Sequence, residues 1–412
     1  MGFGPGRHIR RDPLLVKILA PRPLFQIAVL IVLVSLLTAM RFAGAGKPCD
    51  NELRLNQIQV IGSHNSYHAG LGPHEMEFLR ARNPKAADAL SYSHPALDQQ
   101  LNDGVRQIEL DIYADSKGGL YSHPAWPKLM ADAGIARDPD FDPQHLFDKP
   151  GFKVMHVQDL DYRSNCQPFI GCLQTVRRWS KAHPGHLPIF ILIETKESRE
   201  HPEFMTQPEA FTPEIFNALD AEIRSVFREE EIITPDQVRG ARSTLEEAVL
   251  KDGWLCLQRS LGKVVFLMDQ RKVGPIYVQG HPALRGRVIF TNARPGEPDA
   301  AFVEVNEPQD PTLSIPDLIK KGYIVRTRAD ADLRQGKPEG IATRDAALAS
   351  GAQMVSTDFP FVEQSTEGYA VMFPQGEISR CNPVNAPANC NAGALREREG
   401  KSSAADSADT RK

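Results

Sequence analysis

Short apolar runs recur between residues 57 and 360, and most are separated by stretches with helical periodicity. The runs are rich in β-branched residues and are bounded by Gly, Pro, Asn or Asp, as strands are. Several are apolar on both faces, which is typical of a parallel sheet covered on both sides. We predict eight strands, at residues 58–63, 105–113, 152–157, 188–195, 263–269, 287–292, 323–328 and 353–359.

Predicted helices alternate with these strands, so the pattern indicates an α/β fold of the TIM-type (β/α)8 barrel class. The helices fall at residues 94–104, 172–182, 213–227, 243–253, 314–322 and 343–352. No clear helix separates the fifth strand from the sixth, which leaves room for an irregular barrel. Long loops follow strands 1 and 2, at residues 66–93 and 114–151. Both loops would extend from the barrel end where active sites are built.

The N-terminus has the pattern of a targeting segment. Residues 1–22 are basic, residues 24–40 are apolar, and small residues follow, as in a secretory signal. The apolar run of 17 residues is also at the short limit for a membrane span. We therefore expect residues 1–45 to be a cleaved signal peptide or an N-terminal membrane anchor, with the rest exported to the periplasm or secreted. The barrel is assigned to residues 46–394 and a disordered tail to residues 395–412.

Composition and net charge exclude several classes of protein. The chain has 412 residues, 41% hydrophobic and 24% charged, which excludes wholesale disorder and a collagen-like or coiled-coil rod. Its formal charge of −4 becomes −9 without residues 1–45. An acidic exported protein is a poor nucleic-acid binder, because it cannot neutralise a track of phosphates. We expect a monomer with no nucleic-acid partner.

All six cysteines follow the apolar run, in what would be an oxidising compartment, so we expect disulfides. Two close pairs are plausible local bridges, Cys166 with Cys172 and Cys381 with Cys390. A zinc site is a weaker alternative, because no C-x2-C spacing occurs. Sequence alone does not determine the full pairing.

Carboxylates stand at the end of the second predicted strand. Glu109 and Asp111 are two positions apart, so both point to the same side of the strand. They would repel each other unless a cation lay between them. Asn65 and Glu194, at the ends of other strands, could supply further oxygen ligands for a hard divalent ion. The alternative is a pair of exposed carboxylates at a strand exit.

Two histidines, His64 and His156, fall at the ends of the first and third predicted strands. One such histidine alone is more often structural than catalytic. Two around a shared cation suit acid–base attack on a phosphodiester, in which one handles the attacking hydroxyl and the other protonates the leaving oxygen. His123 in the second long loop competes with His156 for the second role. We favour His156 because it ends an apolar strand.

Four blocks in order resemble those of phosphoinositide-specific phospholipase C, and the likeness is to its bacterial and fungal calcium-dependent type. The blocks are GSHNSY, GVRQIELDIY, FKVMHVQDLDYRSNC and LPIFILIETK, and GAQMVSTDF resembles the family's closing strand. The resemblance covers roughly residues 55–362. It implies a TIM-type barrel, a catalytic histidine pair and one calcium ion. It further implies cleavage of the glycerol-side phosphodiester of phosphatidylinositol by the inositol 2-hydroxyl, giving diacylglycerol and a cyclic or open inositol phosphate.

The resemblance also assigns roles to residues. His64 and His156 match the family's catalytic histidines. The positions matching its calcium ligands are Asn65, Glu109, Asp111 and Glu194. The match to the family is only positional for three residues that we expect to bind phosphate or inositol: Lys196, Arg326 and Asp358. The implied partner is a phospholipid at a membrane surface. The chain lacks the pleckstrin-homology, EF-hand and C2 modules of the eukaryotic enzymes, and its 114–151 loop is longer than theirs, which leaves the substrate open.

Three other functional interpretations of the sequence compete with the phospholipase hypothesis. A glycerophosphodiester phosphodiesterase also uses a barrel, but that family begins with His-Arg-Gly, whereas this chain has Asn65, which can ligate calcium. A glycosidase built on Glu109 and Glu194 would leave both histidines and Asn65 unexplained. A calcium-stabilised envelope binding protein needs no catalytic groups, so the retained histidines and oxygen ligands favour an enzyme.

Overall fold

The computed structural model describes residues 1, 2, 4, 49, 52–197, 204–330, 338–362 and 368–397. The chain divides into two units, Met1–Pro48 and Cys49–Lys412, and the second holds the fold. Apart from residues 1, 2 and 4, the predicted signal peptide or anchor lies outside the described residues, as do residues 398–412. Within the described ranges, no helix is both long and apolar enough to cross a membrane.

Eight parallel strands form the central sheet, in the order β6-β5-β4-β2-β1-β9-β8-β7. A parallel bridge between Asn292 and Phe302 joins the two end strands, so the sheet nearly closes into a barrel. The strands are β1 (Ile58–Ser63), β2 (Gln107–Tyr113), β4 (Ile189–Thr195), β5 (Val264–Met268), β6 (Ile289–Phe290), β7 (Phe302–Glu304), β8 (Ile324–Arg328) and β9 (Met354–Thr357). This topology confirms the predicted TIM-type barrel.

Seven of the eight predicted strands are barrel strands, and the prediction for residues 152–157 is wrong. Only β3 (Lys153–Val154) forms there, and it pairs antiparallel with β2 outside the barrel. The run is apolar because Phe152 and Val154 are buried against the core. The missing barrel strand is β7, which is too short for a periodicity signal. A further short strand, β10 (Ser379–Cys381), pairs antiparallel with β1.

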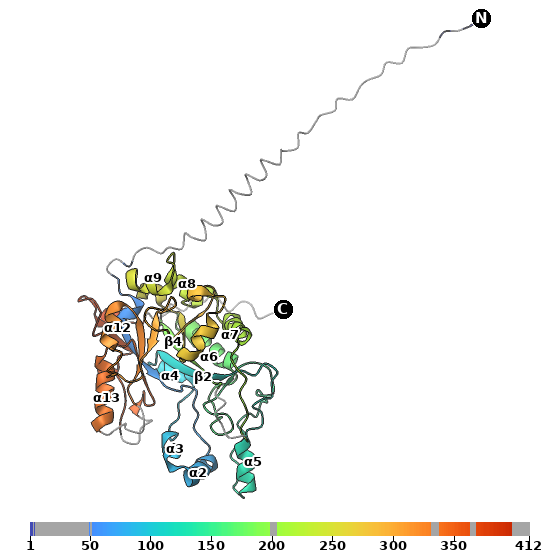
Figure 1. Ribbon diagram of the computed structural model, residues 1–412, viewed down its shortest axis with the longest axis vertical. Helices are drawn as coiled ribbons and strands as arrows, with labels where there is room; N and C mark the ends of the chain where they lie inside the picture. Colours follow the sequence, from blue (N-terminus) through green and yellow to red (C-terminus); the bar gives the residue numbers. More distant parts are fainter. Residues whose placement is uncertain are drawn as a thin grey trace. The chain divides into compact units, whose positions relative to one another are not determined.

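Helices cover the barrel, and all six predicted ones are present (Figure 1). They are α4 (Leu97–Asn102), α6 (Phe169–Ala182), α7 (Pro213–Val226), α9 (Leu245–Lys251), α12 (Ile315–Lys321) and α13 (Pro338–Ala349). The hydroxyl of Thr212 caps α7, accepting a hydrogen bond from the backbone of Ile215, and Pro213 fits the first turn. Shorter helices are α8 (Pro235–Arg239), α10 (Leu257–Ser260) and α11 (Gly274–Tyr277), with 3-10 turns η1 (Leu55–Gln57), η2 (Glu229–Glu231), η3 (Arg271–Val273), η4 (Pro282–Leu284), η6 (Pro374–Gly376) and η7 (Ala392–Leu395). The β5–β6 connection holds only α11, η3 and η4, which fits the expected irregularity.

The two long loops fold together at the carboxyl end of the barrel. They carry α2 (Pro73–Arg82), α3 (Pro84–Ala89) and α5 (Ala125–Asp132), which Figure 1 shows on the same side of the sheet. A second apolar cluster joins them, separate from the barrel core. Its buried members are Phe78, Leu79, Ala87, Tyr113, Tyr121, Trp126, Met130, Phe147, Met155 and Tyr162. The loops thus form a packed wall beside the strand ends.

Three disulfides use all six cysteines. Both predicted local pairs are present, Cys166–Cys172 and Cys381–Cys390, and the third bridge joins Cys49 to Cys256. Residues 395–397, which we assigned to a disordered tail, belong instead to the folded domain. Leu395 is buried in the core, and Glu397 forms an ion pair with Arg106 at 2.6 Å.

Candidate active site

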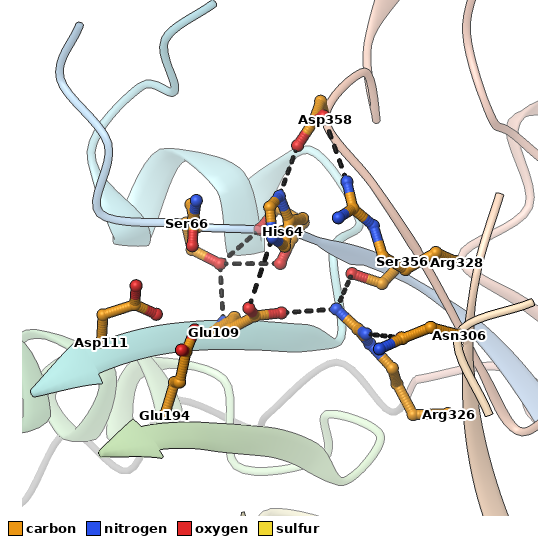
Figure 2. A network of polar contacts seen from close by, with 12 residues as sticks. His64, Ser66, Glu109, Asp111, Glu194, Asn306, Arg326, Arg328, Ser356 and Asp358 are labelled. Carbon is orange, nitrogen blue, oxygen red and sulfur yellow. Dashed lines mark hydrogen bonds and ion pairs between the residues drawn. The ribbon is translucent and has the colours of Figure 1, made fainter. Parts of the chain in front are cut away.

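Strand register brings His64 and Asp358 together. Ser63 of β1 pairs with Thr357 of β9, and the backbone N–H of His64 continues the ladder by donating to the Thr357 carbonyl at 2.9 Å. The next side chains therefore face each other, with His64 Nδ1 2.6 Å from Asp358 Oδ1 (Figure 2). On its other side, His64 Nε2 lies 3.6 Å from Glu109 Oε1.

The surroundings of this histidine favour its neutral form. Burial, with the nearby Arg328 charge and against the attraction of Asp358, lowers the pKa of His64 to about 3. Burial opposes ionisation of Asp358, but the contact with His64 outweighs it and holds the pKa of this carboxyl below its usual range. Because Nδ1 of His64 faces a carboxylate, the neutral ring carries its proton on Nδ1. Its Nε2 is then unprotonated and can accept a proton from a substrate.

Three carboxylates gather at the ends of β2 and β4. Asp111 stands beside Glu194 in the parallel register, and one oxygen from each of Glu109, Asp111 and Glu194 lies within 4.8 Å of the others. Asp111 Oδ1 is buried without a hydrogen-bond partner. Burial, together with Asp111 and against Arg326, raises the pKa of Glu109 to about 8. Like charges this close favour cations beside them, and oxygen ligands that include a buried oxygen without a partner fit Ca2+.

Asn65, the fourth predicted ligand, lies at the end of β1 with 1% exposure and a positive φ of 47°. Asparagine tolerates this left-handed conformation better than most residues. Its Oδ1 accepts a hydrogen bond from Tyr67 at 3.3 Å, and its Nδ2 donates to the Tyr92 hydroxyl at 2.8 Å. The amide is therefore oriented by its neighbours at the same end of the barrel as the carboxylates.

Lys196 follows Glu194 by two positions and contacts the carboxylates directly. Its Nζ lies 2.7 Å from Asp111 Oδ2 and 2.9 Å from Glu194 Oε1. We predicted that Lys196 would grip phosphate or inositol. The structure places its ammonium on the acidic cluster, where it offsets part of the negative charge.

The two arginines of β8 lie at different depths. Arg326, which we predicted to bind the substrate, is 1% exposed and pairs with Glu109 at 2.7 Å (Figure 2). It also pairs with Glu304 at 3.0 Å. Arg328 lies two residues nearer the barrel mouth, 3.3 Å from Asp358 Oδ2, with its Nε buried and unpartnered. Residues two apart on a strand share a face, so only their depth distinguishes them. Sequence reasoning selected the deeper one.

His156 lies on a hairpin that follows β3, not at the end of a barrel strand as we predicted. A bridge between Val157 and Asp161 closes this hairpin, so that His156 Nδ1 lies 2.9 Å from Asp161 Oδ2. The hydroxyl of Tyr113, the last residue of β2, donates to the His156 carbonyl at 3.1 Å. Burial opposes protonation, but the hydrogen bond and charge of Asp161 outweigh it and raise the pKa of His156. The sequence analysis gave Asp161 no role.

Both catalytic candidates face one cavity of about 200 Å³. Its lining includes His64, Asn65, His156, Arg328 and Asp358. His123, the alternative to His156, lines a different cavity, formed by the second long loop together with Glu75, Tyr162 and Arg163. The structure therefore brings His156, and not His123, to the cavity of His64.

A parallel barrel with two imidazoles and a carboxylate cluster at its carboxyl end defines a barrel enzyme equipped for metal-assisted acid–base chemistry. The family described as "Phosphoinositide phospholipase C, Ca2+-dependent" matches residues 53–383. The chain belongs to this family, which confirms the resemblance in its sequence blocks and an enzyme of the phosphoinositide phospholipase C type.

Solved structures show distant likenesses, and no curated protein matches the chain. A Ca2+-dependent phosphatidylinositol-specific phospholipase C from Streptomyces antibioticus is 18% identical, with a TM-score of 0.47, over 74% of this chain and 95% of that one. A calcium-dependent phosphoinositol-specific phospholipase C from Pseudomonas sp. is 16% identical, with a TM-score of 0.46, over 82% and 98%. The phosphatidylinositol-specific phospholipase C of Listeria monocytogenes is 12% identical, with a TM-score of 0.42, over 79% and 95%.

Proposed function

We propose that this protein cleaves phosphatidylinositol at the glycerol-side phosphodiester in a calcium-dependent reaction, giving diacylglycerol and a cyclic or open inositol phosphate. One observation carries the proposal. His64 and His156 each direct Nδ1 at a carboxylate, Asp358 and Asp161 respectively, and both line the same small cavity. Each ring therefore keeps Nε2 for a reacting oxygen, which is the arrangement that paired acid–base catalysis requires.

The roles of the two histidines follow from their partners. Asp161 stabilises the protonated form of His156, so His156 is the acid that gives its proton to the glycerol oxygen as the P–O bond breaks. His64 is then the base that takes the proton of the inositol 2-hydroxyl while that oxygen bonds to phosphorus. Asp358 accepts the Nδ1–H of His64 and stabilises the imidazolium that forms.

One calcium ion would be held by Asn65, Glu109, Asp111 and Glu194. When bound, Ca2+ offsets the negative charge that grows on the phosphoryl oxygens. Arg328 lines the cavity, whereas Arg326 is buried, so we assign phosphate contact to Arg328 in place of Arg326. The ammonium of Lys196 contacts Asp111 and Glu194 and offsets part of their negative charge.

The setting is an exported enzyme that works as a monomer at a membrane surface. The three disulfides support export, because such bridges persist in oxidising compartments. The basic and apolar N-terminal pattern supports the same conclusion.

Phosphorus NMR of the products from phosphatidylinositol, with and without calcium, tests the proposal. We expect inositol phosphate only with calcium, reversible loss on chelation, and a loss of about 10²–10⁴-fold in His64→Ala or His156→Ala. His145→Ala, whose side chain is 77% exposed, is the matched control and should retain full activity. Turnover of glycerophosphoinositol but not of phosphatidylinositol would overturn the lipid assignment, and near-normal activity in either histidine variant would overturn its role.

A further inference from the structure

A third histidine, His68, lies behind the cavity and is fully buried. It ends the turn that begins at His64, and its backbone N–H donates to the Asn65 carbonyl at 2.8 Å. A bridge with Ser164 ties the same residue to the segment that directly follows the hairpin of His156. His68 thus joins the two segments that supply the acid and the base.

His68 shares a carboxylate oxygen with His156. Its Nε2 lies 2.9 Å from Asp161 Oδ2, the same oxygen that lies 2.9 Å from His156 Nδ1. The two imidazole rings are 6.1 Å apart and nearly perpendicular, at 81°. Asp161 Oδ1 is buried without a hydrogen-bond partner, so Oδ2 receives both contacts.

This geometry determines which nitrogen of each ring carries a proton. A carboxylate oxygen between two imidazoles accepts from both, so Nε2 of His68 and Nδ1 of His156 are the protonated atoms. The remaining Nδ1 of His68 is buried without a partner. An unprotonated nitrogen is less costly to bury there than an N–H group or a second positive charge. The His68 tautomer with its proton on Nε2 leaves Nδ1 unprotonated and donates to Asp161 Oδ2.

We propose that His68 is a positioning residue for the reaction: it holds Asp161 so that His156 keeps its Nδ1 proton and presents Nε2 to the cavity. The proposal rests on the role assigned to His156 in the proposed function. A carboxylate with a single donor can rotate and offer either oxygen. A second donor fixed in the core removes that freedom, as outer partners of ligating histidines do.

The other face of His68 supports the cavity wall. Its ring centroid lies 4.4 Å from that of Tyr92, at an interplanar angle of 34°. The Tyr92 hydroxyl accepts the hydrogen bond from Asn65 Nδ2, and Tyr92 lines the cavity. One buried ring therefore contacts the partner of the acid on one side and the partner of a proposed calcium ligand on the other.

Loss of the His68 donor should change the acidity of His156 in a definite direction. The groups that act on His156 are Asp161, with Lys196, Asp111 and Glu194 farther away, and His68 through Asp161. Without the second donor, the charge of Asp161 acts on His156 undivided and stabilises its imidazolium. His156 should then release its proton less readily, and its ring should be held less firmly.

Nitrogen-15 NMR of the histidine side chains tests the proposal without turnover. In the calcium-free wild type, we expect the proton on Nδ1 of neutral His156 and on Nε2 of His68. His68→Asn shortens the side chain, so its amide no longer reaches Asp161, whereas His68→Gln retains an amide donor near the position of Nε2. We expect the titration midpoint of His156 to move to higher pH in His68→Asn and to return toward wild type in His68→Gln.

Kinetics supply the second readout. We expect kcat to fall by about 10- to 100-fold in His68→Asn with KM nearly unchanged, and to recover in part in His68→Gln. His145→Asn is the matched surface control. The opposite tautomer of either histidine in the wild type would overturn the proposal even if the variants failed to fold. So would a folded His68→Asn with the wild-type midpoint and kcat. Failure of the wild type to cleave phosphatidylinositol would instead refute the proposed function and leave the NMR result to stand by itself.

Discussion

At the scale of single residues, strand periodicity and chain order predict which polar side chains meet in the candidate site. Polar residues at strand ends identified His64 and the carboxylates, because parallel strands present their carboxyl ends on one side of a sheet. Periodicity shows which face a side chain occupies but not how deep it lies, so Arg326 was preferred to Arg328. Asp161 was missed because its contact with His156 depends on a hairpin closure that has no sequence period.

The two arginines of β8 should separate into a kinetic and a structural role. Arg328→Ala should lower kcat/KM by about 10- to 100-fold, the equivalent of one charge-assisted hydrogen bond to phosphate, and leave the free energy of unfolding nearly unchanged. Arg326→Ala should cost about 3–5 kcal/mol of stability, because it leaves Glu109 and Glu304 buried without their cation. Enzyme kinetics and urea unfolding of both variants check this. A stable Arg326→Ala with impaired substrate affinity would reverse the two assignments.

Glu109→Gln tests the cation site. The amide keeps the size of the side chain but removes one negative charge from the cluster, and calcium affinity depends on the number of charged ligands. We expect the calcium dissociation constant to rise about 10-fold or more, measured by calorimetry and by the calcium concentration for half-maximal activity. Glu230→Gln, at a side chain that is 69% exposed, is the control. An unchanged calcium requirement would remove Glu109 from the ligand set.

At the scale of elements, the sequence predicts long, buried strands well and short ones poorly. β2 and β4 span seven residues each and were predicted within two residues of their observed ends. β7 has three residues, and its membership in the barrel depends on register with β8 rather than on its own composition. The prediction of a barrel strand at residues 152–157 was wrong because an apolar segment packed against the core has the same sequence pattern whether or not it joins the barrel.

The connection between α6 and β4 should make stability depend on pH. His186 is buried there, with Nε2 2.7 Å from Ser180 Oγ, and burial lowers its pKa to about 4. The unfolded chain, with a histidine pKa of about 6.5, binds the proton first, so this contribution is complete above that pH and is lost as the pH falls toward 4.

Between pH 7 and pH 5 the loss should be roughly 2 kcal/mol. His186→Gln keeps a polar partner for Ser180 but does not titrate, so the difference between wild type and variant isolates His186 from the carboxylates. Urea unfolding at the two pH values measures it. If the free energy of unfolding changed equally between the two pH values in wild type and variant, His186 would not be neutral in the folded state.

At the scale of the whole molecule, the candidate active site lies at the carboxyl end of the barrel, and contacts between distant segments stabilise the amino end. The carboxyl end is walled by the two long loops with their own apolar cluster. The amino end is tied by contacts between distant segments, such as Glu397 with Arg106. Such contacts join residues with no shared local pattern, so the local disulfides were predictable from spacing and the Cys49–Cys256 bridge was not.

This long bridge should be the more stabilising kind. Cys49–Cys256 spans 207 residues, whereas Cys381–Cys390 spans 9. Closing a longer loop removes more entropy from the unfolded chain, so replacing both Cys49 and Cys256 with Ala should cost about 4–5 kcal/mol, and replacing Cys381 and Cys390 about 2–3 kcal/mol. Urea unfolding of the two double variants, each in its oxidised form, compares them. Equal losses would show that the unfolded chain stays compact near Cys49 and Cys256, and that the bridge acts mainly through its packing in the folded state.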